Sequence, residues 1–311
     1  MNTRIREIYW ILAGVLAAVS IASLTGQVLK RRRPGDPMIE NLNARIRSWW
    51  VLILVSGGAL LTGRMAVILL FAGVSFLALR EFQAPVRRAE YAALFVCVSL
   101  ALPVQYVLAG EGWRGEVSIW IPVCGFPILA MAAALIADNG QFLDRTAATL
   151  WGLVVCVYCI SCIPSLMALR IPGYERRTPI LMVFLVLIAQ VSDVSQFVWG
   201  KLLGRHQVAP RLSPSKTVEG LLGGVLSATL LGALMWPMTP FTIWQAGLMA
   251  FLIAILGFLG GLTMSAIKRG RGIKDWSRLI EGHGGILDRI DSLCFSAPVF
   301  FHLTRYFFSR P

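Results

Sequence analysis

Charged and polar residues that could bind phosphate and a metal ion gather in one short stretch near the end of the chain. Six Lys and Arg residues lie within 268–289. Asp288 and Asp291 are spaced by three residues, so both carboxylates share one face if the segment is helical. Paired carboxylates beside clustered cations suit a hard divalent ion that carries a polyphosphate. The stretch therefore predicts a site where Lys and Arg neutralise phosphate oxygens.

Glycines surround a histidine in this stretch, in the run Gly282-His283-Gly284-Gly285. Glycine lets the backbone approach a ligand closely. His283 could bind phosphate or orient the loop, and a structural hydrogen bond is the alternative. A purely topological role would account for the cations, but not for the glycines or the carboxylate pair.

Asp193 is a second candidate, because it lies inside an apolar run. It precedes the end of that run by about six residues, which places it about 9 Å deep in a helix. A carboxylate at that depth is costly and usually faces a cavity or a partner. Asp193 can therefore have a catalytic or metal-binding role, or it can make a structural contact between helices.

The segment from Ser213 to Gly220 is a third candidate, and it has the pattern of a helix start. Ser followed by Pro is typical of an N-cap with Pro at the first helical position. Lys216 would then lie in the first turn, where a cation is normally unfavourable. A cation is favoured there if it receives a phosphate. An ordinary capped entry into the next apolar run is the alternative.

Membrane helices have to position these residues. The chain has 311 residues, of which 57% are apolar and 14% charged, with a net charge of +13. A typical soluble domain is about 45–50% apolar and about 25% charged. These values exclude a disordered chain, a small disulfide scaffold and a nucleic-acid-binding globule, so no nucleic acid is expected as a partner. The six cysteines all lie in apolar runs, as packing residues would.

The fold class predicted is an all-α polytopic integral membrane protein with about 9–10 transmembrane helices. A span needs about 20 mostly apolar residues. The candidate runs are 8–29, 49–63, 65–80, 90–110, 117–137, 147–169, 179–199, 218–236, 242–267 and 290–308. The second and third runs are short and are separated only by Gly63-Arg64. A re-entrant hairpin or one kinked element there would lower the count to nine or eight.

The distribution of cations predicts the orientation. With the N-terminus outside, 20 of the 29 Lys and Arg residues fall in the five inside gaps, which fits the positive-inside rule. Those gaps are 30–48, 80–90, 138–146, 200–217 and 268–289. We divide the chain into an N-terminal transmembrane region, 1–178, and a C-terminal catalytic region, 179–311, with cytoplasmic loops 200–217 and 268–289. The absence of a targeting segment and of large soluble domains suits a bacterial inner membrane, with the active site facing the cytoplasm.

The motifs above resemble a known family. The run Ser265-x2-Lys268-Arg269-x4-Lys274-Asp275-x7-His283-Gly284-Gly285-x2-Asp288-Arg289-x-Asp291 is similar to the signature of phosphatidate cytidylyltransferase, also called CDP-diacylglycerol synthase. Ser192-Asp193 and the segment 213–220 resemble the same family in the expected order, and the clear resemblance covers about residues 179–300. It implies that CTP and phosphatidic acid give CDP-diacylglycerol and pyrophosphate. It also implies a requirement for Mg²⁺, with a second cation as an option, and no covalent enzyme intermediate.

The resemblance assigns roles by position. Three carboxylates would face one cavity and hold the metal: Asp288, Asp291 and Asp193. The catalytic set adds Lys268 to these three. Seven further residues would bind the nucleotide, its phosphates or the lipid: Ser213, Lys216, Ser265, Arg269, Lys274, His283 and Arg289. A homodimer and contacts with membrane lipids are the other partners implied.

Three departures from the family pattern indicate a divergent subgroup. The family usually carries Gly-Asp-Leu-x-Glu-Ser where this chain has 260–265, so Gly261 and Met264 replace both acidic residues. Glu281 replaces a Pro before the glycine run, and 194–197 replaces Thr-x-Ala-Tyr. A missing carboxylate at Gly261 leaves the number of metals open. The alternatives are a cytidylyltransferase for another lipid phosphate, a non-catalytic lipid-binding paralogue and, least favoured, a transporter.

Overall fold

Nearly all regular structure in the protein is helical, which confirms the predicted fold class. The computed structural model describes residues 3–84, 89–112, 114–136, 142–174, 177–277, 279 and 284–310. Within these residues the one sheet is a two-stranded antiparallel hairpin of β1 (Gln207–Ala209) and β2 (Ser213–Thr217).

The helices follow the ten apolar runs in order. They are α1 (Thr3–Arg32), α2 (Pro37–Thr62), α3 (Arg64–Gln83), α4 (Ala89–Glu111), α5 (Arg114–Ile119), α6 (Phe126–Ile136), α7 (Phe142–Leu153), α8 (Ile160–Ser165), α9 (Pro179–Leu203), α10 (Val218–Leu234), α11 (Ile243–Gly270) and α12 (Leu287–Phe308). The π-helical segments Trp120–Gly125 and Val154–Cys159 join α5 to α6 and α7 to α8. Short 3-10 turns, Leu166–Ala168 and Trp236–Met238, follow α8 and α10.

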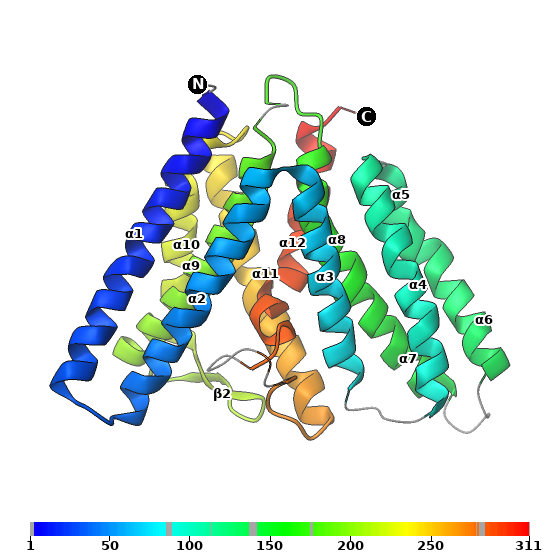
Figure 1. Cartoon of the computed structure of the whole chain (residues 1–311), viewed down its shortest axis with the longest axis horizontal. Helices are drawn as coiled ribbons and strands as arrows, with labels where there is room; N and C mark the ends of the chain where they lie inside the picture. Colours follow the sequence, from blue (N-terminus) through cyan, green and yellow to red (C-terminus); the bar gives the residue numbers. More distant parts are fainter. Residues whose placement is uncertain are drawn as a thin grey trace.

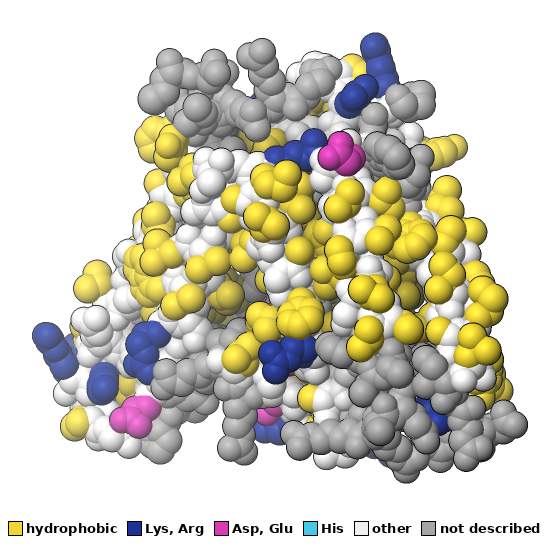
Figure 2. All heavy atoms as spheres, turned by 45° about the vertical axis from the view of Figure 1, so that its right-hand side comes forward, with side chains coloured by type: hydrophobic (Ala, Val, Ile, Leu, Met, Phe, Trp, Pro, Cys, Tyr) yellow, Lys and Arg dark blue, Asp and Glu magenta, His cyan; other side chains and the backbone are white. Residues whose placement is uncertain are grey.

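Seven helical segments in the described part of the chain are long and apolar enough to cross a membrane. Two shorter apolar helices, Val96–Glu111 and Val218–Leu234, accompany them, and α12 belongs to neither group. Figure 2 shows hydrophobic side chains in a broad band across one face, with Lys and Arg above and below it. These features identify an integral membrane protein, because apolar side chains face lipid and charged ones face water.

The two short apolar runs form separate helices. α2 has 26 residues and α3 has 20, because flanking polar residues continue the helix beyond each apolar run. Gly63 alone joins them, with a φ of 126° in the region that favours glycine. Figure 1 shows α2 and α3 meeting at this turn at the upper end of the molecule and diverging toward the lower end.

Three of the cation-rich gaps lie at the same end of the molecule. Figure 1 shows the α1–α2 connection, the β hairpin and the loop between α11 and α12 at the lower end, and both termini at the upper end. This alternation agrees with the order of gaps that the charge distribution predicts. The hairpin and the described parts of the loop between α11 and α12 therefore lie at the same end of the C-terminal helices.

Small residues bring the C-terminal helices close together. A Cβ atom at Gly224 of α10 would lie 2.2 Å from Gln196 Cγ and 2.9 Å from the backbone N of Gln196, both in α9. A Cβ atom at Gly232 would lie 2.2 Å from the Cβ of Ala250 in α11. Interfaces of this kind let helix backbones approach within a membrane.

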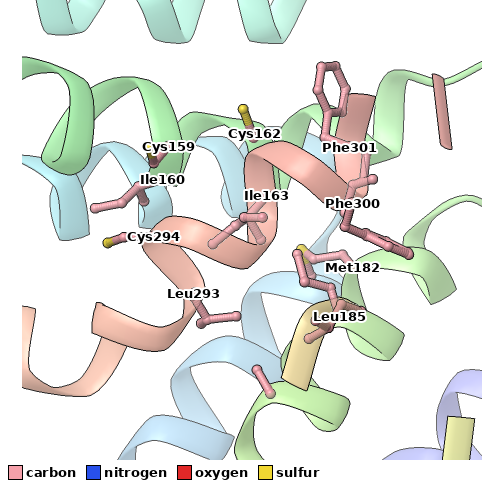
Figure 3. Close-up of a cluster of buried hydrophobic side chains, with 14 of the residues drawn as sticks. Cys159, Ile160, Cys162, Ile163, Met182, Leu185, Leu293, Cys294, Phe300 and Phe301 are labelled. Carbon is pink, nitrogen blue, oxygen red and sulfur yellow. The ribbon is translucent and has the colours of Figure 1, made fainter. Parts of the chain in front are cut away.

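The core extends from these helices into the first half of the chain. Figure 3 shows Cys159 of the π-helical segment Val154–Cys159, Cys162 of α8 and Cys294 of α12 among aliphatic and aromatic side chains. These cysteines are buried and unpaired, as expected of packing residues.

The close approach of α10 to α9 at Gly224 can be tested by replacing this glycine with Ala. The added methyl meets the backbone of α9, so we expect Gly224→Ala to lower the free energy of unfolding by about 1–3 kcal/mol. Thermal unfolding in detergent micelles measures this. Gly58→Ala is the matched control, because Gly58 lies within α2 and a Cβ atom there would meet nothing within 4 Å. Equal melting temperatures for the two variants would show that close packing of α10 against α9 at Gly224 does not contribute to stability.

Candidate active site

Asp288 joins the end of α11, the following loop and the start of α12. Its Oδ1 accepts a hydrogen bond from Lys268 Nζ at 2.5 Å. Its Oδ2 accepts the backbone N–H groups of Trp276 at 2.9 Å and Gly285 at 3.0 Å. Asp288 and Lys268 are both buried. A buried charge is tolerated when it is paired and hydrogen-bonded, and this pair meets that condition.

Two glycines let the backbone approach buried carboxylates. Gly284 has a φ of 81°, and a Cβ atom there would lie 2.8 Å from Asp288 Oδ2. A Cβ atom at Gly285 would lie 2.4 Å from Glu81 Oε2. The glycine run predicts a close approach of the backbone to a ligand, whereas in the structure Gly284 and Gly285 make room for the carboxylates of Asp288 and Glu81. Glu281, Gly282 and His283 lie outside the described residues, so the role of His283 stays a prediction.

Glu81 of α3 is a site residue that sequence reasoning missed. Its Oε1 accepts the Ser277 hydroxyl at 2.6 Å and the backbone N–H of Ile286 at 3.0 Å. Its Oε2 accepts the backbone N–H of Leu287 at 2.8 Å. The only available signal was an acidic residue at the polar end of the third apolar run. Its partners lie about 200 residues further along the chain, so the sequence could not identify them.

Asp193 and Asp291 belong to a second cluster of charges. Asp193 of α9 has Asp291, Lys216 and Arg289 among its charged neighbours. Asp291 Oδ1 accepts the backbone N–H of Ser292 at 2.8 Å. In the part of the chain that the structure describes, no ion pair within 4 Å joins either carboxylate to a cation. Asp193 and Asp291 therefore differ from Asp288, whose two oxygens are both engaged.

The ammonium group of Lys216 belongs to the same cluster and lies against Gly261 of α11. Its Nζ lies 4.7 Å from the centre of the Phe258 ring and 3.4 Å from the Phe258 carbonyl oxygen. A Cβ atom at Gly261 would lie 2.8 Å from Lys216 Nζ and 3.8 Å from Asp291 Oδ2. The ammonium group thus lies beside the position where the family pattern has an acidic side chain. Burial lowers the pKa of Lys216, while Asp291 and Asp193 favour its charged form.

The predicted helix start at Ser213 is wrong. Residues 213–217 form β2, and α10 begins at Val218 with Thr217 as its N-cap. Thr217 Oγ1 accepts the backbone N–H of Gly220 at 3.1 Å, and the N–H of Val218 donates to the His206 carbonyl oxygen at 2.8 Å. Residues 213–217 pair with the preceding strand β1, so the helix starts later. Lys216 therefore projects from a strand.

The other predicted residues are distributed around the two clusters. Ser265 Oγ donates to the Gly261 carbonyl oxygen at 2.7 Å, within α11. Arg269 is exposed, and its Nη1 donates to the Ile273 carbonyl oxygen at 3.1 Å. Lys274 is also exposed, and Ser213 is half-buried in β2. The structure thus brings together six of the predicted residues: Asp193, Lys216, Lys268, Asp288, Arg289 and Asp291.

The donor set fits a metal ion that arrives with phosphate, and does not form a closed protein cage. Among the described residues, no three His, Cys, Asp or Glu side chains are placed to hold a metal. Asp193 and Asp291 offer two carboxylates, and Mg²⁺ commonly binds one or two carboxylates together with phosphate oxygens and water. Arg289 Nε is buried without a hydrogen-bond partner in the described part of the chain, so it remains a donor for such an anion.

Replacing Lys268 tests the buried ion pair that Lys268 forms with Asp288. Lys268→Met leaves the Asp288 carboxylate buried without its ammonium partner, so we expect the free energy of unfolding to fall by about 3–5 kcal/mol. Thermal or denaturant unfolding in micelles measures the change. Lys201→Met is the control, since Lys201 is exposed at the end of α9. Equal stability of the two variants would show that the Lys268–Asp288 pair does not stabilise the fold.

Comparisons with known proteins identify the family of this chain. Residues 43–307 match the cytidylyltransferase family. The chain is 37% identical over 296 residues to "Uncharacterized protein YnbB" of Escherichia coli (strain K12), which covers 95% of this chain and 97% of that protein. It is also 37% identical over 130 residues to the phosphatidate cytidylyltransferase of Staphylococcus saprophyticus and 38% identical over 130 residues to that of Staphylococcus epidermidis, each match covering 40% of this chain and half of the relative. Since the family match extends over most of the chain, this protein belongs to the cytidylyltransferase family.

Proposed function

We propose that this protein transfers the cytidylyl group of CTP to phosphatidic acid, giving CDP-diacylglycerol and pyrophosphate. The observation that carries the proposal is the pair of carboxylates Asp193 and Asp291 beside Lys216 and Arg289, in a chain of the cytidylyltransferase family. The partial likeness to phosphatidate cytidylyltransferases supports phosphatidic acid as the lipid. The integral membrane fold suits a lipid substrate.

The reaction needs cations around a triphosphate. A phosphate oxygen of the lipid attacks the α-phosphorus of CTP, and the bond from that phosphorus to the bridging oxygen breaks as pyrophosphate leaves. Lys216 and Arg289 neutralise charge on the phosphate oxygens. Asp193 and Asp291 would hold Mg²⁺, which when bound supplies further charge neutralisation for the triphosphate. Lys268 and Asp288 keep the loop and the start of α12 in place.

The position of the cluster suits both substrates. The hairpin and the loop lie at the cation-rich end of the molecule, which the charge distribution assigns to the cytoplasm (Figure 1). CTP is a cytoplasmic solute, and the phosphate of a membrane lipid lies at the interface. A bacterial inner membrane with the site on its cytoplasmic side is part of the proposal.

Product formation tests the proposal directly. Wild-type protein in detergent–lipid micelles, given labelled CTP, phosphatidic acid and Mg²⁺, should form CDP-diacylglycerol. Asp291→Asn should lower kcat at least about 100-fold, because it removes charge from the proposed metal site. Asp144→Asn is the control with the same change of side chain, at an exposed position in the first turn of α7.

Other outcomes have defined meanings. Product from a different lipid phosphate, and none from phosphatidic acid, would replace the lipid substrate. A folded wild-type protein that forms no product with several lipid phosphates and divalent ions would overturn the proposal. A non-catalytic lipid-binding protein would then explain the chain best, and the missing carboxylate at Gly261 would be the observation that favours it.

The space at Gly261 gives a second test. The methyl of Gly261→Ala displaces the Lys216 ammonium group, whose flexible side chain can move without unfolding the protein. A charge-assisted hydrogen bond is worth about 1.5–3 kcal/mol. We therefore expect KM for CTP to rise by about 10-fold or more, approaching the value for Lys216→Met. Gly270→Ala is the control, because a Cβ atom there would meet nothing within 4 Å. An unchanged KM in Gly261→Ala would show that Lys216 does not hold the nucleotide.

A further inference from the structure

The C-terminal end of α3 contacts the loop that carries the motif residues, although it belongs to the N-terminal half of the chain. Glu81 is 6% exposed and accepts three hydrogen bonds, from Ser277, Ile286 and Leu287. The first amides of a helix have no partners within the helix, and a carboxylate beside them also interacts favourably with the helix dipole. Glu81 therefore stabilises the start of α12 from a distant helix.

Phe82, the next residue, contacts the part of the same loop that follows α11. The guanidinium of Arg271 lies 4.2 Å from the centre of the Phe82 ring and 5.6 Å from that of Trp276. Arg271 Nη1 also donates to the Phe82 carbonyl oxygen. The Phe82 and Trp276 rings stack with centres 5.2 Å apart. The end of α3 thus fixes both the beginning and the end of the loop between α11 and α12.

The residues that contact Glu81 and Phe82 are directly connected to the carboxylates of Asp288 and Asp291. Leu287, which donates to Glu81, is followed directly by Asp288, and Asp291 lies one helical turn further on. Trp276, which stacks on Phe82, donates its backbone N–H to Asp288. A shift at the start of α12 would therefore move Asp291 as well. Displacements of about 1 Å in an active site can cost about 100-fold in rate.

We infer that Glu81 is a positioning residue of the proposed reaction, which holds Asp291 in place by fixing the first turn of α12. This inference rests on the proposed function. The carboxylate suits the role because its two oxygens accept all three donors. Glutamine has nearly the same shape but turns one acceptor into a donor, which would face an N–H or O–H group.

The test compares wild type, Glu81→Gln and Glu111→Gln. Glu111 is exposed at the end of α4, so Glu111→Gln is the control with the same change of side chain. Per folded molecule, we expect Glu81→Gln to lower kcat by about 10–100-fold and to raise the Mg²⁺ concentration for half-maximal rate, with KM for phosphatidic acid unchanged. Hydrogen exchange at the amides of Ile286 and Leu287 should become faster. A merely structural role would lower only the folded fraction.

Ser277→Ala covers the case in which Glu81→Gln does not fold. It removes one of the three donors from a half-buried loop position, and we expect a smaller change of kcat in the same direction. With an active wild type, unchanged kcat and Mg²⁺ dependence in the folded variant would overturn the inference. An inactive wild type would instead overturn the proposed function, so the two failures are distinguishable.

Discussion

The burial of the Asp288 carboxylate is the constraint on which the arrangement of the site depends. A charge taken out of water has to be paired, and Asp288 meets this need with Lys268 and two backbone amides. Its three partners are Lys268 at the end of α11, Trp276 in the loop, and Gly285, which lies two residues before the first residue of α12. The described parts of the loop on either side of residues 278–283 are therefore both hydrogen-bonded to this carboxylate. The positions of Arg289 and Asp291, in the same helical turn, follow from it.

The acidic residues of the motif region have different tasks. Asp288 and Glu81 accept hydrogen bonds from the loop and organise it, while Asp193 and Asp291 face the cations of a second cluster. A motif read as a row of equivalent ligands does not distinguish these tasks. The distinction comes from which oxygens are already engaged by the protein.

Gly261 and Lys216 show how a departure from the family pattern changes the site. Without a side chain at 261, the Lys216 ammonium group can lie against α11 near Asp291. The local charge at this position is then positive where the family pattern has a carboxylate. Under the proposed function, a metal ion at this site would have few protein ligands and would take its remaining ligands from phosphate oxygens.

The sequence by itself determined the fold class, the ten apolar segments and the concentration of charge at one end, because apolar length and charge placement are local properties of the chain. It also indicated six residues that the structure brings together, through motifs in a known order. Tertiary structure alone decided that β2 replaces the expected helix start, that Asp288 is engaged within the protein and that Glu81 caps α12. Each of these depends on a hydrogen-bond partner elsewhere in the chain, 206 residues away in the case of Glu81 and Leu287. Which donor meets which acceptor is set by the packing of helices, and spacing along the sequence does not contain that information.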